Sequence, residues 1–248
     1  MTRLPIFLSL SASVVFVCAA CSGFAGRPGP NSEVIAPDQI VEFDILYVQN
    51  CAGCHGAGGS GGAGNALRDP IFLAIADDSA IRNATSNGVR GTPMPAFAQS
   101  AGGMLTDKQI DALVRGIRSW ASSNDLRSAN PPPFAAKTIG HARHGADVYK
   151  TFCSACHGPD GTGGKSASSI VDPSYLALVS DQYLRTEVIA GRPELGAPDW
   201  RGNVPGRPMS DQEVTDVVAW LAARRAVIPG QPYSDSKTAQ YQEHHDVY

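Results

Sequence analysis

The stretch Cys51-Ala52-Gly53-Cys54-His55 decides the fold, because a closely similar stretch, Cys153-Ser154-Ala155-Cys156-His157, follows it 102 residues later. Other features recur at nearly the same distance: Tyr47 with Tyr149, Asp69-Pro70 with Asp172-Pro173, Ile81-Arg82 with Leu184-Arg185, and Gly88 with Gly191. A period of this length is the size of a small domain. The 248-residue chain is therefore predicted to contain two copies of one unit.

Both pentapeptides have the pattern Cys-x-x-Cys-His, which is the attachment signal for c-type haem. Two thiols three residues apart at the end of a helix can form thioethers with the two vinyl groups of one porphyrin, while the adjacent imidazole faces the iron. We therefore expect two haem c groups, held by Cys51, Cys54 and His55 and by Cys153, Cys156 and His157. The alternatives are a zinc site, which would need four Cys or His ligands brought together from both copies, and a redox-active cysteine pair, which would need a βαβ setting.

Each copy ends in the same helix signature. In the first copy Thr106 and Gln109 form a capping box, and in the second copy Ser210 and Glu213 do so. Apolar residues follow at i, i+3, i+4 and i+7, namely Ile110, Leu113, Val114 and Ile117, and Val214, Val217, Val218 and Leu221. This spacing predicts one buried face on each last helix. Residues 44–50 and 146–152, which lead into the two motifs, are predicted to form helices that cross it.

On both attachment motifs and the glycine-rich stretches that follow them, residues 56–64 and 158–164, the chain resembles the class I cytochrome c family. The resemblance covers about residues 41–120 and 145–225. It implies an all-α fold of two tandem domains, each a small helical unit around one covalently bound haem. The predicted domains span residues 38–121 and 141–228, and a Pro-rich linker at 122–140 joins them.

The family places a distal methionine in a loop shortly before the last helix. In the first copy Met94, in Gly91-Thr92-Pro93-Met94-Pro95, lies at this place, 39 residues after His55, so the resemblance implies Met94 as the sixth iron ligand. Met104 is a rival, but it lies close to the cap of the last helix. Ligation by a thioether and an imidazole raises the iron potential and favours electron transfer.

The second copy departs from this pattern, because Ala197 aligns with Met94. Met209 is the other candidate and can ligate the second iron if the loop 199–208 folds back. Two alternatives stay open: Met209 is structural beside an open site, or a nitrogen ligand comes from a histidine. The candidate histidines are His141, His144, His244 and His245.

Charge and composition narrow the function. With 20 Lys and Arg against 23 Asp and Glu, the formal net charge is −3, so no basic field exists to hold nucleic acid. Aromatic residues make up only 7% of the chain, and a porphyrin would fill each small core. Arg82 and Arg185, at equivalent places, either reach a haem propionate or lie on a solvated helix face.

Residues 1–21 have the features of an export signal, with Arg3 followed by an apolar stretch that ends in small residues. Val17-Cys18-Ala19-Ala20-Cys21 resembles a bacterial lipobox, so we expect a lipid on Cys21 and a periplasmic protein anchored at a membrane face. Ordinary cleavage nearby is the alternative. Residues 22–37 are predicted to be a flexible tether, and residues 229–248 a flexible tail.

The family and the expected anchor together indicate an electron carrier rather than an enzyme. We expect single electrons to pass in a respiratory chain between a quinol-oxidising complex and a terminal oxidase or other cytochromes. In the alternative, the second haem is an open-site catalytic centre, or a sensor of gas or peroxide, fed by the first. A further alternative is a fixed subunit of a larger complex.

Overall fold

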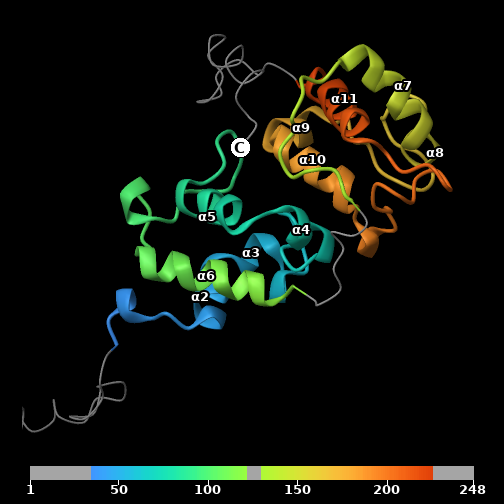
Figure 1. The fold of residues 1–248 in the computed structure, drawn as a ribbon. Helices are drawn as coiled ribbons and strands as arrows, with labels where there is room; N and C mark the ends of the chain where they lie inside the picture. Colours follow the sequence, from blue (N-terminus) through green and yellow to red (C-terminus); the bar gives the residue numbers. More distant parts are fainter. Residues whose placement is uncertain (1–34, 122–129, 226–248) are drawn as a thin grey trace, which may run out of the picture. The chain divides into compact units, whose positions relative to one another are not determined.

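The computed structural model describes residues 35–121 and 130–225, and within these ranges the chain forms helices and no strand. After the short 3-10 helix η2, Pro37–Gln39, two sets of five α-helices follow in the same order (Figure 1). The first set is α2 (Phe43–Asn50), α3 (Ala52–His55), α4 (Pro70–Ile75), α5 (Asp78–Asn87) and α6 (Asp107–Ser119). The second set is α7 (Ala142–Phe152), α8 (Ser154–His157), α9 (Pro173–Leu178), α10 (Asp181–Ala190) and α11 (Asp211–Ala222). The predicted all-α fold is confirmed. In the described ranges no helix is both long and apolar enough to cross a membrane.

The predicted signal, the lipid site at Cys21, most of the tether, part of the linker and the tail lie outside the described residues. Short 3-10 helices interrupt the loops at Ala57–Gly59, Gln99–Ala101 and Pro193–Leu195. The aspartates that recur in the sequence begin the third helix of each set. Asp69 accepts hydrogen bonds from the first amides of α4, and Asp172 does the same for α9.

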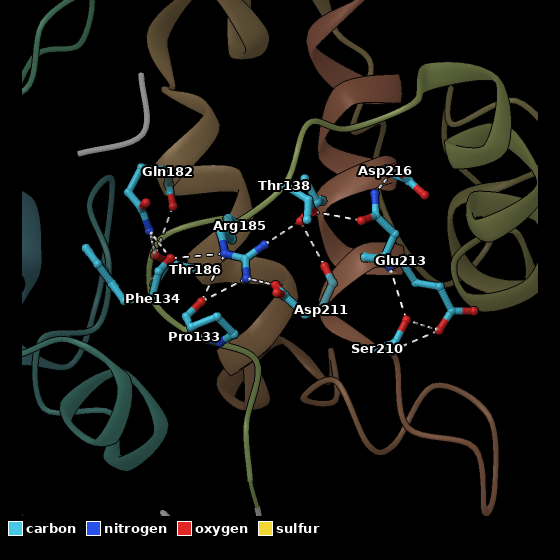
Figure 2. A network of polar contacts seen from close by, with 12 residues as sticks. Pro133, Phe134, Thr138, Gln182, Arg185, Thr186, Ser210, Asp211, Glu213 and Asp216 are labelled. Atoms are coloured by element: carbon cyan, nitrogen blue, oxygen red, sulfur yellow. Dashed lines mark hydrogen bonds and ion pairs between the residues drawn. The ribbon is translucent and has the colours of Figure 1, made fainter. Parts of the chain in front are cut away.

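The last helix of each set begins with the predicted capping box. Thr106 and Gln109 bond each other's backbone amides at the start of α6. Ser210 and Glu213 do so at the start of α11, as Figure 2 shows. All eight predicted apolar positions on these two helices are buried, at no more than 7% exposure. Each last helix therefore turns one face into the core of its own domain.

The entry helix of each domain crosses the last helix at a glycine. Figure 1 shows α2 beside α6 and α7 beside α11. A Cβ atom on Gly116 of α6 would lie 1.9 Å from the Phe43 ring, and one on Gly145 of α7 would lie 2.0 Å from the backbone oxygen of Asp216. In the first domain the glycine is in the last helix, and in the second domain it is in the entry helix. Each one lets the helices approach more closely than a larger residue would.

Arg185 of α10 binds the segment before α7 to the second domain (Figure 2). Its side chain is nearly inaccessible, at 3% exposure, and it donates to the carbonyls of Pro133 and Phe134 at 2.8–3.0 Å. It also donates to Thr215 Oγ1 at 2.9 Å and pairs with the Asp211 carboxylate. Arg185 is therefore not on a solvated face, and its guanidinium is engaged by protein groups rather than free for a propionate.

In the first domain the equivalent arginine has a different partner. Arg82 pairs with Asp111 of α6, and both side chains are about two-fifths exposed. Asp111 stands five residues after the helix cap Thr106, as Thr215 stands five residues after Ser210. The two arginines thus reach the same turn of the last helix in their own domains.

We predict that Gly145→Ala destabilises the second domain by roughly 1–3 kcal/mol, because the added methyl group meets backbone that cannot rotate away. Gly53→Ala is the control, since no atom lies within 4 Å of its Cβ position and the second copy already has Ala155 there. Denaturant unfolding of the holoprotein, followed by haem absorbance, measures both. Equal midpoints for Gly145→Ala and the unmodified protein would contradict the close crossing.

Candidate haem-binding sites

Each attachment motif begins where the entry helix ends. Cys51 follows α2 with φ −119° and ψ −36°, and Cys153 follows α7 with φ −121° and ψ −29°. A single helical turn then carries the chain to the histidine. The amide of His55 donates to Cys51 O at 2.9 Å, and that of His157 donates to Cys153 O at 3.0 Å. Both copies therefore present two thiols and one imidazole from the same one-turn frame.

The four thiols are unpaired, and the first of each pair is the more enclosed. Cys51 is buried, whereas Cys54 and Cys156 are exposed. Burial, reinforced by the nearby second thiol, raises the pKa of Cys51 to about 11 and that of Cys153 to about 12. A redox-active pair needs a lowered thiol pKa, so this alternative is disfavoured. Within the described ranges no three His, Cys, Asp or Glu side chains gather to hold a metal ion, which leaves the zinc alternative without support.

The two histidines are oriented by backbone carbonyls. His55 Nδ1 lies 2.9 Å from Asn65 O, and His157 Nδ1 lies 2.8 Å from Ser168 O. Because a carbonyl only accepts, Nδ1 carries the proton in both rings and Nε2 keeps its lone pair for a metal. Burial also lowers the pKa of His55, against the opposing effect of the Asn65 bond. The neutral ring is the form that binds iron.

The glycine-rich loops fold back tightly against the attachment turn. Gly56 and Gly158 have φ of 77° and 82°, a conformation that favours glycine, and they reverse the chain directly after each histidine. The amide of Gly61 then donates to His55 O at 2.8 Å, and that of Gly163 donates to His157 O at 2.9 Å. Each loop is thus hydrogen-bonded to the attachment motif. The carbonyl that binds the imidazole Nδ1 follows shortly after the loop.

Two tyrosine hydroxyls complete this turn, and the sequence reasoning did not assign them a role. Tyr47 donates to Gly56 O at 2.9 Å, and Tyr149 donates to Gly158 O at 2.5 Å. Both tyrosines are buried, and their rings contact Trp120 and Trp220, with centroids 5.0 Å and 4.2 Å apart. In the sequence, the sign of this shared role is that Tyr47 and Tyr149 are 102 residues apart, as are the two attachment motifs.

The donor set in both domains fits haem c. Two thiols, separated by one helical turn, lie beside an imidazole whose Nδ1 is bonded and whose Nε2 is free, which is the arrangement that holds a covalent porphyrin and its iron. Cys51, Cys54 and His55 would hold the first haem. Cys153, Cys156 and His157 would hold the second.

Met94 lies in a tightly bonded loop of the first domain. The amide of Val89 donates to Met94 O at 3.0 Å, and Thr92 Oγ1 both donates to Val89 O and accepts from the Met94 amide. Met94 is partly exposed, whereas its rival Met104 is 82% exposed and points to solvent. The assignment of Met94 as distal ligand stays a prediction, and this loop is where it would act.

In the second domain the corresponding loop carries Ala197, whose methyl side chain has no donor atom. Met209 lies in the core at 3% exposure, next to the start of α11. Its assignment as a ligand also stays a prediction.

Two of the candidate histidines lie at the start of α7 and serve Asp216. His144 Nδ1 is 2.6 Å from Asp216 Oδ2, and the His141 amide donates to Asp216 Oδ1 at 2.7 Å. Burial alone would raise the pKa of Asp216, but bonds from His144, the His141 amide and Gln212 lower it. The other two candidates, His244 and His245, lie outside the described residues.

The bond to Asp216 raises the pKa of His144, with smaller contributions from Asp147 and Glu213. A raised folded-state pKa stabilises the fold below about pH 6.5, the ordinary histidine value, and this stabilisation is lost as the pH rises through the folded value. We therefore predict that His144→Ala lowers the melting temperature more at about pH 5.5 than at about pH 9.5. Arg143→Ala, one residue earlier on α7, should show no such difference, because arginine does not titrate. An equal loss for His144→Ala at both pH values would refute the bond's protonation dependence.

In the comparison with known proteins, each domain matches its own family model. Residues 38–115 match a family model described as cytochrome c oxidase, cbb3-type, subunit III, and residues 142–224 match one described as cytochrome c. The curated proteins compared give no match. Among solved structures, a chain of the Kuenenia stuttgartiensis reducing HAO-like protein complex is similar over 78% of this chain and all of its own length. The identity is 16% and the TM-score 0.43, which is too low to carry a conclusion.

Proposed function

Because the chain is a class I c-type cytochrome with two haem-binding domains in tandem, we propose that it passes single electrons along a respiratory chain at a membrane face. Each domain binds one covalent haem c with its iron, and electron transfer is the activity that such domains imply. Haem c supplies reversible one-electron chemistry between its ferric and ferrous states. The proposed donors and acceptors are a quinol-oxidising complex, a terminal oxidase or other cytochromes.

One observation carries the proposal: the same proximal geometry is built twice. His55 and His157 are each fixed by an Nδ1 bond to a loop carbonyl, at 2.9 Å and 2.8 Å. A ring held in this way has its tautomer and orientation fixed, so its Nε2 would be available to a haem iron. Two such sites would give the chain two one-electron centres.

We predict that each motif holds one haem independently. The double variant Cys51→Ala with Cys54→Ala should keep one haem, as should Cys153→Ala with Cys156→Ala, because neither motif borrows a thiol from the other. Intact mass and haemochrome absorbance count the haems, and a redox titration of the unmodified protein should resolve two one-electron steps. A chain that carries no bound macrocycle, or a double variant that loses both, would refute the proposal.

The membrane location rests on Cys21 and the small residues before it. A lipid on Cys21 would hold both haem domains at the membrane face without a spanning helix. The respiratory partners are proposed on the same basis, since quinol-oxidising complexes and terminal oxidases lie in the membrane.

We predict that Cys21→Ser shifts the protein from the membrane fraction to the soluble fraction, because the acylated thiol is removed. Ser13→Ala is the control, since Ser13 lies in the same apolar stretch but outside the five lipobox-like residues, and it should leave the fractionation unchanged. Detergent phase partitioning of cells that express each variant measures the shift. Soluble unmodified protein would contradict the anchor.

A further inference from the structure

The distal loops of the two domains begin at an equivalent glycine and are closed by equivalent hydrogen bonds, although their interiors differ. Each begins at a glycine of positive φ, Gly88 at 69° and Gly191 at 73°. In the first domain the amide after this glycine donates to Met94 O at 3.0 Å. In the second domain the amide of Arg192 donates to Ala197 O at the same distance. The bonding therefore places Ala197 where the first domain has Met94, independently of any sequence alignment.

The closest contacts of the two glycines support the same equivalence. A Cβ atom on Gly88 would lie 2.7 Å from Met94 O, and one on Gly191 would lie 2.8 Å from Ala197 O. In both loops a proline follows, Pro95 or Pro198, and its backbone also contacts the glycine. Alanine at this place cannot bind iron, because a methyl group has no lone pair.

Met209 has the place of Leu105, a residue of the core. The Leu105 amide donates to Phe97 O at 2.7 Å, and the Met209 amide donates to Trp200 O at 2.9 Å. Each residue directly precedes the cap of the last helix, Thr106 or Ser210. Leu105 is 6% exposed and Met209 is 3% exposed. The loop does fold back, but it does so in both domains, and in the first domain the residue it buries is a leucine.

Two ion pairs lie in the later part of this loop, residues 199–208. Arg201 binds the Asp199 carboxylate at 2.6 Å and stacks on Trp200 at 4.7 Å. Arg207 binds Glu213 of α11 at 2.6 Å. The backbone that precedes Met209 thus contacts the helix that follows it, and Met209 packs in the core.

The two described candidate histidines lie at the start of α7, where Asp216 binds the imidazole of His144 and the backbone amide of His141. His144 is bonded to Asp216, and nine residues separate it from Cys153 on the far end of α7, about 13 Å along the helix. His141 lies one turn farther from the motif. Both described candidates are therefore two or more helical turns from the attachment cysteine and are tied to α11 by Asp216.

We infer that the second haem has an open sixth position that takes a small exogenous ligand such as carbon monoxide, while Met94 closes the first. The inference rests on the proposed function in one respect, namely that both domains carry haem. The two domains then differ in function. The first transfers electrons, and the second binds a diatomic ligand and receives electrons from the first.

Carbon monoxide titration of the reduced two-haem protein tests this inference. The expected stoichiometry is one carbon monoxide per chain, with one high-spin ferric haem by electron paramagnetic resonance. Haem content is counted on the same sample, so a chain without two haems would refute the proposed function instead. Two haems with no bound carbon monoxide would overturn the open site.

Three variants locate the open position. Ala197→Met should close it, reducing the bound carbon monoxide from one to none and converting the high-spin haem to low spin. Met94→Ala is the matched change in the first domain and should raise the stoichiometry from one to two. Met209→Leu, which installs the first domain's residue, should leave the stoichiometry at one.

Each contrary result identifies the alternative. If the unmodified protein binds no carbon monoxide and Met209→Leu binds one, then Met209 is the ligand. If His244→Ala or His245→Ala gains the binding instead, then the tail supplies a nitrogen ligand. Binding that persists in Ala197→Met would overturn the placement of Ala197 over the iron.

Discussion

Each iron site depends on one hydrogen bond, from the proximal imidazole Nδ1 to a backbone carbonyl ten or eleven residues later. This bond fixes which nitrogen carries the proton and how the ring is turned. It forms only because a left-handed glycine reverses the chain at Gly56 or Gly158 and a short glycine-rich loop brings the carbonyl back. The tyrosine hydroxyls of Tyr47 and Tyr149 hold the same glycine from the entry helix. The entry helix, the motif and the loop therefore form a single unit.

A second constraint is how the second domain accommodates a buried charge. Arg185 has only donors, and a proline-rich segment offers carbonyls without matching amide donors. The two are complementary, so Arg185 can satisfy the carbonyls of Pro133 and Phe134 while Asp211 balances its charge. In the first domain Arg82 pairs with the carboxylate of Asp111, and both side chains are partly exposed, so the pair is not taken out of solvent as Arg185 is. The equivalent arginine thus takes on an additional structural role in the second copy.

Much of this structure could be predicted from the sequence, because its signals are local. The attachment motifs, the two capping boxes and the apolar faces of α6 and α11 depend on residues within one or two helical turns of each other. The distant partners of Arg185 and of Asp216 could not be predicted, because they lie about 26 to 75 residues away and include backbone carbonyls and amides that have no sequence signature. The glycine at each helix crossing was missed for a related reason. Gly116 and Gly145 stand on different helices of the pair, so the repeat does not align them.

The duplicated frame also explains how iron ligation can change without refolding. The distal loop's path is determined by a positive-φ glycine at its start, a backbone pairing in its middle and a helix cap at its end, and all three are the same in both domains. None of them involves the side chain at position 94 or 197. A substitution there changes what the loop offers to the iron and leaves the loop's own hydrogen bonds intact. The core position before the helix cap is also unaffected by the distal residue. Leu105 and Met209, which occupy it in the two domains, are both unbranched at Cβ and of similar volume. In this fold the side chain offered to the iron can therefore change while the backbone of the distal loop is kept. With two copies in one chain, the second can lose its methionine while the first retains Met94.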